Sequence, residues 1–255
     1  MEKRPPDREK IGRFSMKLLV DTHTHTVASG HAYSTLRENA LLAAQKGLEA
    51  FCCTDHGPGL AGSAPDYILS VLQGVPDTLE GVRMIRGCEL NIKTYDGGVD
   101  LSHKYIEKTE FLIASMHEVV IAPGTEEQNT AALVGALQNP YVDAVGHPGN
   151  PHYPVHIEEV VDAAKRCDKL IEINSHSFSH RKGSDRICPQ FIRLCKQKDV
   201  RITVSSDAHI CYNVGDFEDA VRALEAESFP EELIVSRDLQ AFREYLEERK
   251  RRICQ

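Results

Sequence analysis

A repeated pattern of short apolar runs constrains the fold of this chain more than any other feature. Seven runs rich in β-branched residues alternate with segments of helical periodicity such as 36–47, 157–167 and 189–199. The runs occupy residues 18–20, 50–54, 82–88, 111–115, 142–145, 170–173 and 201–204. Repeated βα units with nearly continuous apolar strands predict an α/β fold with a parallel sheet buried on both faces. Residues 233–235 are a candidate for an additional short strand.

Each of the seven runs ends in polar residues that can carry chemistry. The sequences at these ends are DTHTH, TDH, CEL, MHE, GHPG, EIN and SSDAH, at intervals of 27 to 33 residues, the length of one βα unit. The carboxyl ends of barrel strands meet on one face, so we expect a single shared site there. The polar residues at these ends are His23, His56, Glu89, His117, His147, Asn174 and Asp207.

Closely spaced histidines point to a metal site. His23 and His25 are two residues apart, so on a strand they share one face, and the same rule places Asp21 on that side. His209 follows Asp207 at the same spacing, and His31 follows the first pair by a short loop. The remaining histidines are predicted to be ordinary loop residues, of which only the last two lie near the site: His103, His152, His156, His176 and His180.

Composition and charge narrow the class of protein. The chain has 255 residues, 41% hydrophobic and 27% charged, as in ordinary globular proteins. A formal net charge of −8 disfavours a general nucleic-acid binder. The eight cysteines form no CxxC pair, so we expect reduced, buried thiols. No run approaches the ~18 to 20 apolar residues that a bilayer requires. We therefore expect a cytoplasmic protein with a loose, charged extension at residues 1–15 and one domain at 16–255.

In this order, the HxH pair, the third histidine and the TDH, GCE, SMHE, GHPG, EIN and SDAH motifs resemble the PHP family, named for polymerase and histidinol phosphatase. The sequence is most similar to the YcdX-type phosphatases of that family. The resemblance runs from Met16 to the final helical segment. It implies a distorted TIM-like (β/α)7 barrel with the metal site at the carboxyl ends of the strands, and a hydrolase that acts on phosphate esters.

The resemblance also implies three metal ions. The first would be bound by His23, His25, Glu89 and Asp207. The second would be bound by Glu89, His117 and His147, and the third by His31, His56 and His209. Nitrogen and oxygen ligands suit zinc, manganese or Fe(II), and we expect zinc. Three divalent cations against two carboxylates make a positive pocket that attracts phosphate.

The implied reaction is attack on phosphorus by a hydroxide held between two metals. Glu89, Asp207 and His209 would be the catalytic residues. The predicted loop 175–186 contains the candidate phosphate contacts Arg181 and Lys182, with Arg186 as a weaker candidate. The glycine-rich segments 57–65 and 95–100 are expected to form a rim, and neither has a P-loop pattern.

Three other functions stay open at this point. A histidinol phosphatase or an exonuclease-like phosphodiesterase would use the same ligands. An amidohydrolase-type enzyme would also begin with HxH, but typically uses a bridging lysine and two metals. An inactive regulatory barrel would lack ligands, whereas all nine positions are occupied here. We expect a small phosphorylated substrate, no membrane or nucleic-acid partner, and a chain that can form a homo-oligomer.

Overall fold

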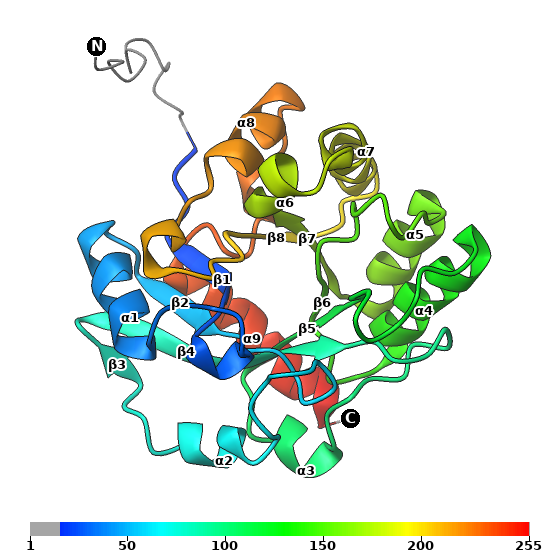
Figure 1. The fold of residues 1–255 in the computed structure, drawn as a ribbon. Helices are drawn as coiled ribbons and strands as arrows, with labels where there is room; N and C mark the ends of the chain where they lie inside the picture. The colour runs from blue at the N-terminus through cyan, green and yellow to red at the C-terminus, as the bar shows by residue number, and fades with distance from the viewer. Residues whose placement is uncertain (1–15, 255) are drawn as a thin grey trace, which may run out of the picture.

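The computed structural model describes residues 16–254, and the predicted extension at 1–15 lies outside them. Seven parallel strands form a nearly closed barrel surrounded by helices (Figure 1), which confirms the predicted architecture. The strands of the barrel, in spatial order, are β1 (Val20–Thr24), β2 (Ala50–Cys53), β4 (Val82–Asn91), β5 (Phe111–Ser115), β6 (Ala144–Val145), β7 (Leu170–Asn174) and β8 (Ile202–Ser205).

One short strand was not predicted from the sequence. β3 (Thr78–Leu79) pairs antiparallel with the start of β4 through a tight turn at Glu80 and Gly81. Both turn residues have positive φ, 51° and 85°, which is the backbone geometry of a two-residue hairpin. This hairpin lies at the end of the barrel opposite to the predicted site, because it precedes the long run of β4 toward Glu89.

Helices cover the outside of the barrel (Figure 1). α1 and α4 each begin with a capping box, in which Thr35 pairs with Glu38 and Thr125 pairs with Gln128. The helices are α1 (Leu36–Gln45), α2 (Ile68–Leu72), α3 (His103–Ile106), α4 (Glu126–Gln138), α5 (Ile157–Cys167), α6 (Ser175–His180), α7 (Ser184–Gln197), α8 (Glu218–Ala226) and α9 (Leu239–Ile253), with 3₁₀ turns η1 (Val27–Ser29), η2 (Cys211–Asn213) and η3 (Glu231–Leu233).

The seam between β8 and β1 is filled by the segment 234–237. The backbone N–H of Val235 donates to Ile202 O at 3.0 Å, and that of Val20 donates to Ser236 O at 3.2 Å. Nearer the carboxyl ends, His25 N donates directly to Ala208 O at 2.9 Å. The additional strand suggested at residues 233–235 is not formed. This stretch is the end of η3 followed by a single bridge at Ile234.

α9 closes the barrel at the amino-terminal ends of its strands (Figure 1). Phe242 and Tyr245 are buried in the cluster that fills this end, and the Phe242 ring lies 5.3 Å from that of Phe111 on β5. Beside them Arg249 Nε donates to Asp143 Oδ2 at 2.7 Å. Among the described residues, this end of the barrel is filled by side chains, and the predicted ligands lie at the opposite end.

The structure also bears on membrane-spanning helices and on the cysteines. Within residues 16–254, no helix has both the length and the apolarity needed to cross a membrane. None of the eight cysteines in this range forms a disulfide, and six of them are buried. Their packing agrees with the role predicted for them as small core residues.

Candidate active site

All nine predicted ligands gather at the carboxyl ends of the strands. They come from widely separated parts of the chain, because each βα unit returns its strand end to the same face. His23 lies in β1, Glu89 lies in β4, and the others follow the ends of their strands: His25, His31, His56, His117, His147, Asp207 and His209.

The residues proposed for the first metal ion converge on two carboxylates. His23 Nε2 is 3.3 Å from Glu89 Oε2 and 3.6 Å from Asp207 Oδ1. His25 Nε2 is 3.5 Å and 3.2 Å from the same two oxygen atoms. His23, His25 and Asp207 form a group whose ligand atoms lie within 4.8 Å of one another.

Glu89 extends toward the residues proposed for the second ion through its other oxygen. His117 Nε2 lies 3.3 Å from Glu89 Oε1, and His147 Nε2 lies 3.1 Å from it. Glu89 therefore presents one oxygen atom to each group. This is the arrangement that a bridging carboxylate requires.

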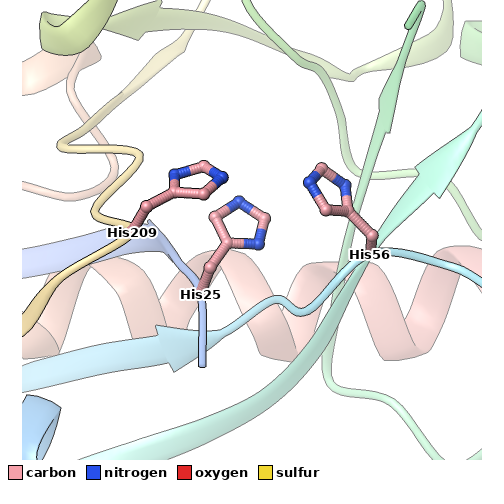
Figure 2. Close-up of side chains that lie close together, drawn as sticks. All are labelled: His25, His56 and His209. Atoms are coloured by element: carbon pink, nitrogen blue, oxygen red, sulfur yellow. The ribbon is translucent and has the colours of Figure 1, made fainter. Parts of the chain in front are cut away.

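The residues proposed for the third ion do not form one separate group. His31 Nε2 and His209 Nε2 are 2.9 Å apart, but His56 Nδ1 lies 2.7 Å from Glu89 Oε2. Figure 2 shows His25, at the end of β1, lying between His209 and His56. The ligand atoms of these three residues also lie within 4.8 Å of one another, as do those of His56, Glu89 and His117. His56 thus stands between the proposed groups.

Hydrogen bonds at the opposite ring nitrogens fix the tautomers of several histidines. His25 Nδ1 donates to Ser29 Oγ at 2.9 Å, since that hydroxyl in turn donates to Asp55 Oδ1 at 2.6 Å. His117 Nδ1 donates to Asn91 Oδ1 at 2.7 Å. Each Nε2 atom is thereby left with a lone pair directed into the site, as in metal-binding histidines generally.

The same logic applies to His31 and His209. Their Nδ1 atoms donate to the backbone oxygens of Ser29 and Asp207, at 3.1 Å and 2.9 Å. Two lone pairs on Nε2 atoms therefore face each other across 2.9 Å. Such an arrangement is repulsive unless a cation lies against both atoms.

Several buried polar atoms in the site have no hydrogen-bond partner among the described residues. They are His23 Nε2, His25 Nε2, His56 Nδ1 and Glu89 Oε2. Each unsatisfied buried polar atom costs about 1–3 kcal/mol. Coordination of divalent ions would satisfy these atoms together, and imidazole and carboxylate are ligands suited to such ions. The residues present therefore fit a metal centre.

The local electrostatics keep the carboxylates charged and one central imidazole neutral. Although burial raises it, the pKa of Glu89 is held well below its ordinary value by His23, His56 and His117. Burial likewise opposes ionisation of Asp207, yet His23, His25 and Arg181 lower the pKa of that carboxyl. Burial and the neighbouring His56 depress the pKa of His25 well below its ordinary value, which favours the neutral form that binds metals.

Two of the predicted ligands have a strained backbone conformation. His147 and Asp207 have φ angles of 30° and 54°, in the left-handed region that non-glycine residues seldom adopt. Such conformations cost of order 1–3 kcal/mol and persist where surrounding contacts impose them. Here they turn the side chains that follow β6 and β8 back over the open end of the barrel.

A cavity of about 690 Å³ opens above these residues. Arg181 and Lys182, the candidate phosphate contacts, both line it, and Arg181 Nη2 donates to Asp207 Oδ2 at 3.1 Å. Arg186 is exposed on α7 and is not among the lining residues. The prediction of a loop at residues 175–186 was wrong. This segment contains α6 and the start of α7, and Arg181 directly follows α6.

The two glycine-rich segments have different positions. Leu60 and Ala61, from segment 57–65, line the cavity and form part of its rim. Segment 95–100 lies behind that rim, where Asp100 Oδ2 accepts from Gly59 N at 2.7 Å. Two histidines assigned to ordinary loops, His152 and His180, also line the cavity. His180 was expected near the site, whereas the prediction that His152 lies away from it was wrong.

Three side chains that support the ligands, two of them fully buried, were not singled out from the sequence. Asp55 holds Ser29, Asn91 holds His117, and Glu172 Oε1 accepts from His23 Nδ1 at 2.6 Å. Each lies within two residues of a strand-end motif.

The predicted orientation of Asp21 was wrong. Its carboxylate accepts from Ser206 N at 3.1 Å and does not share the face of His23 and His25.

Comparison with known proteins identifies the family. The model of the PHP domain matches residues 21–227.

This chain belongs to the PHP domain family.

A probable phosphatase of Caldanaerobacter subterraneus subsp. tengcongensis is 46% identical over 244 residues, covering 95% of this chain and 96% of that protein. A probable phosphatase of Acetivibrio thermocellus is 47% identical over 238 residues, covering 93% and 99%. The YcdX-type subtype is compatible with these matches and stays a prediction.

Solved structures extend the likeness in fold. A histidinol phosphate phosphatase from Lactococcus lactis, complexed with zinc, L-histidinol and phosphate, superposes with a TM-score of 0.63 at 19% identity, over 85% of this chain and 95% of that chain. At this level of identity the likeness concerns the barrel alone. The PHP fold and the relatives named as phosphatases together point to a hydrolase.

Proposed function

We propose that the protein is a metal-dependent phosphoesterase, acting on phosphomonoesters and using three divalent ions, with zinc favoured over manganese and iron. The observation that carries the proposal is the set of buried, unpartnered nitrogen and oxygen atoms around Glu89, directly below a cavity lined by Arg181 and Lys182. Neutral imidazoles supply most of the ligands, so the bound cations keep much of their charge. An anionic ester is the substrate that such a pocket attracts.

The protein residues have distinct roles in this proposal. When bound, divalent ions would lower the pKa of a coordinated water to roughly 7 and polarise a phosphoryl oxygen. Glu89 and Asp207 each lie close to both His23 and His25 and would hold a metal ion together with them. Arg181, fixed by Asp207 and by Ser177 Oγ at 2.9 Å, presents its guanidinium to phosphate oxygens in the cavity.

The ligand residues and the family match also bear on the alternative functions. A histidinol phosphatase or an exonuclease-like phosphodiesterase would share this metal centre and differ in the loops around the cavity. The family match disfavours an amidohydrolase, and an inactive barrel is disfavoured because all nine ligand positions are filled. A small phosphorylated substrate, a cytoplasmic location and self-association remain part of the proposal.

Hydrolysis of p-nitrophenyl phosphate tests the reaction class. We expect the metal-loaded protein to release p-nitrophenol, EDTA to abolish the activity, and zinc or manganese to restore it. Release is followed by absorbance. Hydrolysis of amides or deamination of bases by the loaded protein, with no turnover of any phosphoester, would refute the proposal, whereas preference for a phosphodiester would change only the substrate class.

The number of ions is tested separately. Because the ligands form three adjoining groups, we expect about three divalent ions per chain in protein purified without a chelator. Elemental analysis against amino-acid quantification measures this ratio. A ratio near two would favour a two-metal variant, and a ratio of one or less at saturating metal would exclude the trinuclear centre.

A further inference from the structure

Glu172 is a buried carboxylate directly behind the candidate metal centre. Its neighbours Ile171 and Ile173 belong to the core between the strands and the outer helices, so alternation along β7 turns Glu172 into the barrel. Its exposed fraction is only 2%. No part of the phosphoesterase mechanism proposed above uses this side chain.

The two oxygen atoms of Glu172 are each occupied by donors from different parts of the site. Oε1 accepts from His23 Nδ1 at 2.6 Å and from Ser205 Oγ at 2.7 Å. Oε2 accepts from the backbone N–H of His147 at 2.6 Å and from Asn174 Nδ2 at 3.3 Å. One carboxylate thus contacts a ligand proposed for the first ion and a ligand proposed for the second.

Both contacts set the position of a ligand atom. The bond from Nδ1 means that, in the neutral imidazole of His23, the lone pair is on Nε2, which faces Glu89 and Asp207. The bond to the main chain holds His147 where φ is 30° and Nε2 lies 3.1 Å from Glu89 Oε1. When a metal ion fixes either His23 or His147, that histidine fixes the Glu172 carboxylate in the position that the other histidine requires.

Building on the proposed metal-dependent function, we propose that Glu172 is a positioning residue that couples the first and second metal groups, so that the two ions are retained or lost together. Asn174 extends this coupling, since the same amide nitrogen lies 3.1 Å from Asp207 Oδ2.

An amide cannot replace the carboxylate, although it has the same shape. Glutamine at this position offers one acceptor and one donor, whereas His23 Nδ1 and His147 N are both donors. If the amide oxygen faces His147, its NH2 group faces His23 and favours the tautomer with a proton on Nε2, which cannot bind a metal. If the amide is reversed, two N–H groups meet at His147. In either orientation the amide cannot accept from both donors, so the connection between the two groups is broken.

Graded removal of zinc from the loaded, full-length protein tests the inference. Zinc is released by increasing chelator and counted with a metal-sensitive dye, in parallel with thermal melting. In the unmodified protein we expect two ions to leave together, whereas in Glu172→Gln we expect them to leave in separate steps, the first at about 10- to 100-fold lower chelator activity, with the third ion retained. Glu172→Asp keeps both acceptor oxygens and should recover part of the loss.

Thr203→Val is the matched control. Thr203 pairs with Glu172 across β7 and β8, is fully buried, and bonds Thr22 Oγ1 at 2.7 Å without contacting a histidine. It should lower the melting temperature and leave zinc release unchanged. Unchanged release in Glu172→Gln, or two ions that still leave together in that variant, would overturn the coupling.

Failure of the proposed function gives a different pattern. Unmodified protein that holds its ions in this experiment but hydrolyses no phosphoester would refute the phosphoesterase and leave the coupling in place. Unmodified protein that binds fewer than two ions would refute both.

Discussion

Glu89→Gln should lower metal occupancy and reduce turnover by about 100-fold or more. Glu89 has one oxygen atom facing the ring nitrogens of each of the first two ligand groups, and its Oε2 atom has no hydrogen-bond partner among the described residues. Glutamine keeps the volume and one carbonyl oxygen but removes the negative charge that would bridge two cations. Its NH2 group would also face imidazole nitrogens that must be free to bind metal.

Three measurements on one preparation separate a ligand from a structural residue at position 89: metal content, turnover and melting temperature. His103→Ala is the control, because His103 is exposed on α3 and contacts Tyr141 away from the cavity. It should change none of the three appreciably. A lower melting temperature in Glu89→Gln with normal metal content and turnover would remove the bridge from the mechanism.

The barrel could be predicted because its signals repeat. Each strand is an apolar run buried on both faces, and each ends in polar residues that have no role in a hydrophobic core. Seven repeats of one spacing leave few alternatives to a barrel with a shared site. The convergence of the nine predicted ligands followed directly, since these residues lie at strand ends and not in distant loops.

Local irregularities could not be predicted by the same reasoning. Strict alternation placed Asp21 on the face of His23 and His25, but the pairing of β1 with β2 shifts register between Asp21 and Thr24. The shift frees Asp21 to accept from Ser206 N and from Gly215 N at 2.8 Å. A pattern of period two carries no information about such a bulge.

The supporting residues were hidden for a different reason. Glu172 lies within a run of apolar strand residues, and Asn91 and Asp55 are adjacent to residues that already explained their motifs. Their importance depends on which ring nitrogen each contacts, as with Asn91 Oδ1 and His117 Nδ1 at 2.7 Å. That information exists only once the strands are placed side by side.

Arg249→Met should destabilise the folded protein by about 3 kcal/mol without changing metal binding by folded molecules. Asp143 is fully buried at the closed end of the barrel, where Arg249 Nε donates to its Oδ2 atom at 2.7 Å. Methionine fills much of the space but leaves that carboxylate without its closest cation. Arg252, 3.5 Å from Asp143 Oδ1, compensates only in part, which places the expected loss at the lower end of the usual range of about 3–5 kcal/mol.

Urea unfolding of metal-loaded protein measures the change, with Arg222→Met as the control. Arg222 makes an exposed pair with Glu218 at 2.9 Å on α8, and such pairs contribute about 0.3–0.5 kcal/mol. Combining Asp143→Asn with Arg249→Met should recover part of the stability, because the uncompensated charge is then removed. Equal losses in Arg249→Met and Arg222→Met would mean that the ion pair does not hold α9 against the barrel, and that closure of this end depends on the packing of Phe242 and Tyr245 alone.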